Sequence, residues 1–184
     1  MIDSAAMSTD AGIAGGNGVS AAVAGVATTA LEREALAVAR GICRLFARND
    51  IWCLAEMPLR NGRRADLMGI DTRGHVVIVE IKVARADLLG DAKWTEYLDH
   101  CDRFYWGLAP HLDRTILETP AFLPERCGVI VGDGYDAEIL RPAASQPLAA
   151  ARRKAEIERL ARAALRRQTA ALDPQGGWWR DGGA

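Results

Sequence analysis

The segment at residues 63–83, which reads RRADLMGIDTRGHVVIVEIKV, carries the clearest structural signal in the chain. Its second half is rich in Val and Ile, whose branched side chains favour a β-strand. Apolar residues on both faces of this half are typical of a central strand that is covered on two sides. Asp71 and His75 fit the ends of a three-residue hairpin loop, in which Gly74 takes the left-handed conformation. The stretch therefore predicts two antiparallel strands joined by a tight turn.

This hairpin sets Asp66 opposite Glu80, because a register that pairs Asp71 with His75 pairs those two residues as well. Directly opposed side chains have Cβ atoms roughly 5 Å apart, where like charges repel. Two carboxylates so placed share either a proton or a cation. Lys82 lies on the same face as Glu80, because side chains alternate along a strand, and it could neutralise the pair in part. A divalent cation such as Mg²⁺, which prefers oxygen ligands, would do so more fully.

Two other interpretations of the hairpin stay open. The hairpin could be exposed and carry ordinary surface charges, because burying a charge is costly. A slip of one residue in the strand register would place the two carboxylates on opposite faces of the sheet.

The motif resembles a known superfamily. An Asp followed, after thirteen residues, by Glu-x-Lys on the next strand is similar to the site of the PD-(D/E)XK nucleases, with Ala65 where the superfamily name has Pro. The segments RRADL, VEIK, KWTEYLDHCDRFYW and CGVIVGDGYDAEI resemble the bacterial MmcB-like DNA repair proteins over about residues 31–170. The resemblance implies an α/β fold with a restriction-endonuclease-like core, in which helices flank a mixed central β-sheet. The family label implies DNA repair and does not by itself establish nuclease activity.

The same resemblance implies roles for individual residues. Asp66, Glu80 and the carbonyl oxygen of Ile81 would hold Mg²⁺ or Mn²⁺, and Lys82 would orient the attacking water. Glu34 lies on the first predicted helix, where the superfamily often places a further glutamate near the metal, so it is a candidate auxiliary acid. A solvated helix charge explains Glu34 equally well, since surface charges contribute little to stability.

Basic residues near the motif are candidates for phosphate contacts. Arg63 and Arg64 directly precede the predicted acid pair, and a guanidinium group can bind phosphate with two parallel hydrogen bonds. Lys93 falls in the first turn of a helix expected to begin after an Asp91 N-cap, where the helix dipole disfavours a cation. This placement suggests a phosphate or site role, with an ordinary surface lysine as the alternative.

A basic helix is predicted over residues 148–171. Between residues 152 and 167 the chain has seven basic residues and two acidic ones. Such a helix is typical of contact with the DNA backbone, and we expect Arg162 and Arg166 to take part. A solvated helix that docks by its few apolar residues is the alternative, and both roles can coexist on opposite faces.

Composition limits the remaining possibilities. The chain has 184 residues, of which 49% are hydrophobic, enough for one domain over residues 31–171 with tails at 1–30 and 172–184. Both tails are expected to be disordered. The net charge is −1, so DNA affinity requires a local basic patch. Four widely spaced cysteines support reduced thiols rather than a zinc site, and no targeting or membrane-spanning segment is predicted, which favours a cytoplasmic protein.

The other predicted elements follow from hydrophobic spacing and turn residues. Two functions compete: metal-dependent hydrolysis of damaged or branched DNA, and a domain that holds DNA or another repair protein without cutting. The expected elements are a helix over 31–48, strands over 51–59, 103–108, 128–132 and 137–141, an irregular linker or single turn over 83–90, a helix from 91 to about 101, and a loop over 119–126.

Overall fold

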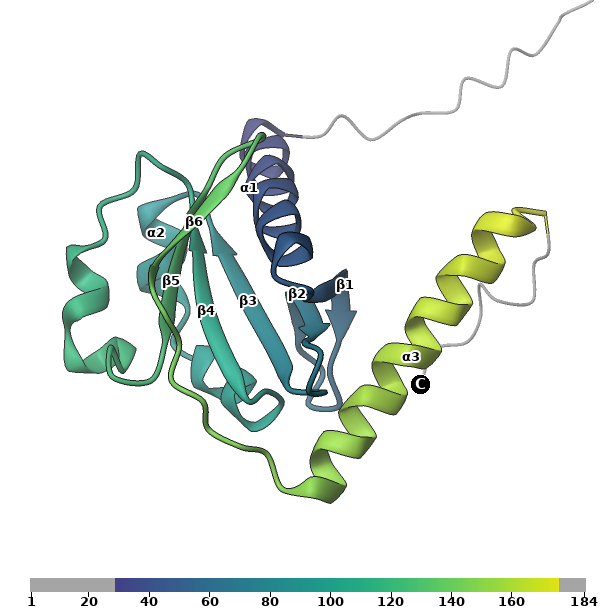
Figure 1. Ribbon diagram of the computed structural model, residues 1–184. Helices are drawn as coiled ribbons and strands as arrows, with labels where there is room; N and C mark the ends of the chain where they lie inside the picture. Colours follow the sequence, from purple (N-terminus) through teal and green to yellow (C-terminus); the bar gives the residue numbers. More distant parts are fainter. Residues whose placement is uncertain (1–28, 176–184) are drawn as a thin grey trace, which may run out of the picture.

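The computed structural model describes residues 29–175. One six-stranded sheet forms its centre, with the strands in sequence order (Figure 1). The elements are α1 (Ala30–Arg48), β1 (Trp52–Pro58), β2 (Arg64–Ile70), β3 (Val76–Lys82), α2 (Arg85–Gly90), the 3₁₀ helix η1 (Trp94–Asp99), β4 (Arg103–Leu108), the 3₁₀ helices η2 (Thr115–Glu118) and η3 (Pro120–Phe122), β5 (Gly128–Gly132), β6 (Ala137–Arg141) and α3 (Ala150–Leu172).

The sheet is mixed, as predicted. Strand β2 is antiparallel to both β1 and β3, strands β3, β4 and β5 run parallel, and β6 returns antiparallel to β5. Parallel neighbours need a crossover connection. The segment with α2 and η1 supplies it between β3 and β4, and the segment with η2 and η3 supplies it between β4 and β5. The expected α/β class, with helices around a mixed sheet and a basic C-terminal helix, is confirmed.

Most predicted elements are found with nearly the predicted bounds, but the segment after β3 differs. A short helix, α2, occupies part of the expected linker, and the expected helix from Asp91 is the 3₁₀ helix η1. Asp91 follows α2 as its C-cap residue and does not cap η1, which starts after Lys93. The physical reason is that the Asp91 carboxylate accepts a hydrogen bond from Lys82. The predicted tails lie largely outside the described residues.

Helix α1 covers one face of the sheet. It begins with a capping box, in which Thr29 and Glu32 each bind the other's backbone N–H. Its buried stripe contains Val38, Ile42 and Phe46, spaced four residues apart. Leu31, in the first turn of the helix, lies outside this stripe and is 54% exposed.

The central strand β3 is covered on both faces, and its residues alternate between them. A Cβ atom placed on Gly107 of β4 would lie 2.7 Å from Ile42 of α1 and 2.9 Å from Val79, so Val79 faces α1. Glu80 therefore faces the other side, beside its register partner Trp106. There Trp106 packs against Trp94 of η1, with ring centroids 5.1 Å apart. The aromatic residues of β4 are thus buried core residues.

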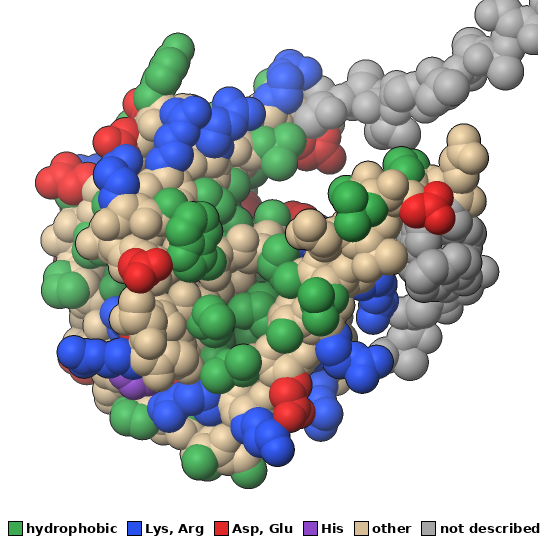
Figure 2. All heavy atoms as spheres, turned by 45° about the vertical axis from the view of Figure 1, so that its right-hand side comes forward, with side chains coloured by type: hydrophobic (Ala, Val, Ile, Leu, Met, Phe, Trp, Pro, Cys, Tyr) green, Lys and Arg blue, Asp and Glu red, His purple; other side chains and the backbone are tan. Residues whose placement is uncertain are grey.

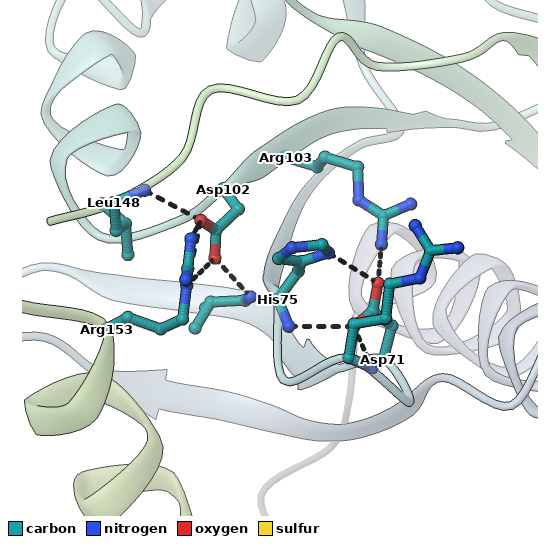
Figure 3. A network of polar contacts seen from close by, with 8 residues as sticks. Asp71, His75, Asp102, Arg103, Leu148 and Arg153 are labelled. Carbon is teal, nitrogen blue, oxygen red and sulfur yellow. Dashed lines mark hydrogen bonds and ion pairs between the residues drawn. The ribbon is translucent and has the colours of Figure 1, made fainter. Parts of the chain in front are cut away.

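Asp102, the residue directly before β4, forms hydrogen bonds with three separate parts of the chain (Figure 3). Its buried carboxylate accepts hydrogen bonds from the backbone N–H of Val76, from that of Leu148, and from the guanidinium group of Arg153 in α3. Burial would raise the pKa of Asp102, but these hydrogen bonds outweigh it and hold the pKa below its ordinary value. Helix α3 is therefore anchored where β3 and β4 begin.

All four cysteines carry free thiols, as expected. No helix within residues 29–175 combines the length and the apolar character that crossing a membrane requires.

Candidate active site

The β2–β3 hairpin has the predicted register. Leu67 pairs with Val79 and Ile70 with Val76, while the Asp71 N–H donates to the carbonyl of His75. Gly74 has φ +75°, the left-handed conformation that the turn requires.

The same register places Asp66 opposite Glu80 on the face away from α1. The regular ladder ends one pair earlier, at Leu67 and Val79.

Beyond the end of this ladder, the Asp66 side chain replaces the backbone of β2 as the hydrogen-bond partner of β3. The backbone N–H of Ile81 donates a 2.6 Å hydrogen bond to Oδ2 of Asp66. In an extended strand the N–H and C=O of one residue point to the same side, so the Ile81 carbonyl also faces β2 and Asp66. The Asp66 carboxylate and this carbonyl thus lie on the same side of β3, and Glu80 is the residue directly before Ile81 in the strand.

Burial dominates the electrostatics of the acid pair. It raises the pKa of Asp66 to about 6, against the opposing effects of the Ile81 hydrogen bond and the charge of Lys82. It raises the pKa of Glu80 to about 8, with further help from the negative charge of Asp66. Oε2 of Glu80 is buried and has no hydrogen-bond partner among the described residues. A buried oxygen of this kind is costly unless a proton or a cation satisfies it.

Lys82 is held by three carboxylates. Its Nζ lies 3.3 Å from Glu80, 3.4 Å from Asp87 and 3.1 Å from Asp91. Burial alone would lower the pKa of Lys82, but these charges outweigh it and raise the pKa. Sequence reasoning missed Asp87 and Asp91 as site residues, since only α2 and its C-cap bring them to Lys82.

Arg63 extends this ion-pair network towards η1. Its Nη1 lies 3.7 Å from Asp91, its Nε lies 2.8 Å from Glu96, and its guanidinium group lies over the ring of Tyr97. The Tyr97 hydroxyl donates to the carbonyl of Arg64. Burial and the charge of Glu80 raise the pKa of Tyr97 to about 12. Arg63, a predicted phosphate contact, is therefore engaged with acidic side chains.

Arg64, the other predicted phosphate contact before the acid pair, forms an ion pair with Glu56 of β1. Its Nε lies 2.5 Å from Oε2 of Glu56, and both side chains are more than half exposed. Glu56 has φ +53°, which is unusual for a residue other than glycine. Arg167 of α3 donates to the carbonyl oxygens of Ala55 and Glu56, and so holds this distorted turn of the strand. The negative charge of Glu56 also contributes to the raised pKa of Asp66.

Two predicted residues are not joined to this network. Glu34, the candidate auxiliary acid, lies on α1, and its Oε1 is 3.2 Å from Nδ1 of His111. Within the described residues it is not among the groups that shift the pKa values of Asp66 and Glu80. Lys93 is exposed just before η1, and the structure gives its side chain no contact with the acid pair among residues 29–175.

Helix α3 uses several of its basic residues for docking. Arg153 binds Asp102, Arg167 binds the β1 backbone, and Arg159 pairs with the buried Glu156. The predicted contact residues Arg162 and Arg166 are exposed. Figure 2 shows Lys and Arg side chains along one side of this helix and hydrophobic side chains towards the body of the molecule.

The donor set limits what kind of cation could fit. Among residues 29–175 no group of three or more His, Cys, Asp or Glu side chains is arranged to hold a metal ion. The pair Asp66 and Glu80 with the Ile81 carbonyl supplies oxygen donors only, so it suits a hard cation that keeps several water ligands, as Mg²⁺ does. The unpaired Oε2 of Glu80 is compatible with such an occupant.

Fold and site together define an α/β domain with an acid pair and a lysine at the end of its central hairpin. The sequence matches the family described as DNA repair protein MmcB-like over residues 24–175. The chain belongs to this MmcB-like family of DNA repair proteins.

A solved structure is similar in sequence and fold. It is the SPO1766 protein of unknown function from Silicibacter pomeroyi, with 38% identity and a TM-score of 0.68. The match covers 78% of this chain and 94% of that chain. No curated protein matches significantly.

Proposed function

We propose that this protein hydrolyses phosphodiester bonds of DNA during repair, with a divalent metal ion held by Asp66 and Glu80. The observation that carries the proposal is the pair of carboxylates on adjacent strands, of which Asp66 is partly buried and Glu80 is buried. Oε1 of Glu80 accepts a hydrogen bond from Lys82, and its Oε2 has no partner among the described residues. The resemblance to the PD-(D/E)XK nucleases supports the same assignment. Membership of a DNA repair family supports DNA as the substrate.

Each residue has a role that its position allows. Asp66, Glu80 and the Ile81 carbonyl would hold Mg²⁺ or Mn²⁺. When bound, such an ion lowers the pKa of a coordinated water and stabilises negative charge on the phosphoryl oxygens. Lys82, whose Nζ lies 3.3 Å from Glu80, would orient the water and stabilise the charge that develops at phosphorus. The water oxygen forms the new bond to phosphorus, and one bridging P–O bond breaks.

Cleavage assays on labelled nicked, branched and intact DNA test the proposal, in Mg²⁺, Mn²⁺ or EDTA. We expect metal-dependent cleavage by the natural protein, and its loss in Asp66→Asn and Glu80→Gln. Glu138→Gln, which removes an exposed acid on the distant strand β6, is the matched control and should cleave normally. Calorimetry should show a metal site that is lost in Glu80→Gln. Equal cleavage by Asp66→Asn and the natural protein would overturn the assignment.

A domain that binds DNA without cutting is the second candidate. The specific observation in its favour is that Lys82 is already surrounded by Glu80, Asp87 and Asp91, an arrangement that can serve stability alone. In that case DNA affinity would survive loss of the acid pair and fall on changes to Arg162 and Arg166.

A further inference from the structure

A hollow of about 410 Å³ lies beside the candidate active site. It is open to solvent and is lined by the β1–β2 turn, by η1 with the residue that follows it, and by the first turn of α3. Pockets of about 300–1,000 Å³ commonly hold small ligands, so the space suits a phosphate group with part of its nucleotide. Its lining residues are Arg60, Asn61, Glu96, Asp99, His100 and Arg152.

Two guanidinium groups of this hollow lack acidic partners. Arg152 makes one long hydrogen bond, 3.4 Å to the carbonyl oxygen of Asp99. Within residues 29–175 the structure gives Arg60 no hydrogen bond or ion pair. Asn61 binds the backbone N–H of Arg63 through its side-chain oxygen, which leaves its amide NH₂ as a further donor.

Positive charges also converge from the neighbouring part of α3. The pKa of Arg159 is lowered by burial and by repulsion from Arg60. The pKa of His100 is lowered by burial and by the charges of Arg159 and Arg152. Arg159 itself pairs with Glu156, and its Nε is buried without a partner among the described residues. Arg60 and Arg159 therefore repel each other, Arg152 adds positive charge beside His100, and an anion would relieve this accumulation of charge.

The acids of the hollow do not cancel this excess. The carboxylate of Glu96 is bound to Arg63 at 2.8 Å, and Glu156 is buried between His100 and Arg159. Asp99 is the remaining acid in the lining.

A continuous chain of contacts joins the hollow to the acid pair. Glu96 lines the hollow and binds Arg63, Arg63 pairs with Asp91, and Asp91 binds Lys82 at 3.1 Å. A DNA strand that extends from Lys82 along these charged residues would lead to the hollow.

We propose that the hollow between Arg60 and Arg152 binds a backbone phosphate of the DNA strand next to the one that is cut. The cleavage of the neighbouring phosphodiester rests on the function proposed above. The phosphate contact does not, because a protein that holds DNA without cleaving it would use the same contact. Arg60 and Arg152 donate to the phosphate oxygens, and the amide of Asn61 is a third donor.

The salt dependence of DNA binding tests the proposal. The variants are Arg60→Gln, Arg152→Gln and both together, and Arg40→Gln, an exposed arginine on α1, is the matched control. Each lost phosphate contact should reduce the slope of log affinity against log salt concentration by about 0.9 on duplex DNA. This corresponds to about fivefold weaker binding per contact at 0.15 M salt. Arg40→Gln should keep the natural slope, and thermal melts should show that every variant is folded.

Three further outcomes separate the possibilities. An unchanged slope in the folded double variant would overturn the proposal. Weaker binding of inorganic phosphate by that variant, with an unchanged slope on DNA, would assign the hollow to free phosphate and overturn the DNA assignment. A reduced slope in the double variant, together with a natural protein that never cleaves DNA, would support the hollow as a phosphate site while the nuclease function fails.

Discussion

The backbone N–H of Ile81 donates to the carboxylate of Asp66 at 2.6 Å, at the point where the β2–β3 ladder stops. The Asp66 side chain thus has two roles: it accepts a hydrogen bond from the backbone of the neighbouring strand, and it is one member of the acid pair. The contact fixes the Asp66 carboxylate on the same side of β3 as the Ile81 carbonyl.

The first prediction concerns this contact. Asp66→Ala should lower the free energy of unfolding by about 1–3 kcal/mol, because it leaves the buried Ile81 N–H without an acceptor. Asp66→Asn keeps an oxygen acceptor and should cost clearly less. Urea unfolding in EDTA measures both. Equal losses in the two variants would contradict this explanation, and Asp66→Asn is for the same reason the better variant for activity assays.

The two aspartates that pair with Lys82 should differ in their contribution to stability, because they differ in solvent exposure. Asp91 is 13% exposed and Asp87 is 58% exposed in their side chains. Asp91→Asn should therefore cost about 1.5–3 kcal/mol, the range for hydrogen bonds to charged groups, while Asp87→Asn should cost below about 1 kcal/mol. Unfolding in urea at low and high salt measures the difference. A larger loss from Asp87→Asn would show that solvent does not screen that pair.

Asp102 should make stability depend on pH in acid. Its pKa is lower in the folded protein than in the unfolded chain, so its contribution is present above the ordinary pKa of 3.8 and is lost as pH falls below that. Asp102→Asn should cost about 3 kcal/mol at pH 7, because Arg153 loses its buried partner. The difference between the variant and the natural protein should shrink below about pH 4. A difference in unfolding free energy that stays constant from pH 7 to pH 3 would contradict a stabilising ion pair between Asp102 and Arg153.

Arg167 and Arg162 should behave differently although both are basic residues of α3. Arg167→Ala removes two hydrogen bonds to the β1 backbone and should cost about 1.5–3 kcal/mol. Arg162→Ala should change stability by less than about 0.5 kcal/mol, as expected for a surface position, and should weaken DNA binding. Denaturant unfolding and DNA titration distinguish the two. Similar stability losses in both variants would mean that Arg167 does not anchor the helix.

The backbone conformation of Glu56 gives the last prediction. With φ +53°, Glu56 occupies a region that glycine adopts without the penalty of a side chain. Glu56→Gly should therefore be more stable than Glu56→Ala by about 1 kcal/mol. Both variants lose the carboxylate, so the comparison isolates the backbone. Thermal unfolding measures it, and a more stable alanine variant would refute the assigned strain.

Local patterns in the sequence were enough for much of the fold. The bounds of β4, β5 and β6 follow from short apolar runs between turn residues. The segment after β3 could not be predicted in the same way, because Asp91 has the residue type of an N-cap but binds Lys82 from the end of α2. In that position a tertiary ion pair outweighs a local capping preference.

The sequence alone predicts Asp66 opposite Glu80. The two-residue period of a strand and a turn that needs Gly74 favour that register, because both effects act between residues close in the chain, and the observed pairs exclude the one-residue slip. The charges that surround Lys82, and the choice of which arginines of α3 dock and which stay exposed, follow from the tertiary structure. Those pairings form between distant segments, and their energies depend on burial and distance that exist only once the elements have packed together.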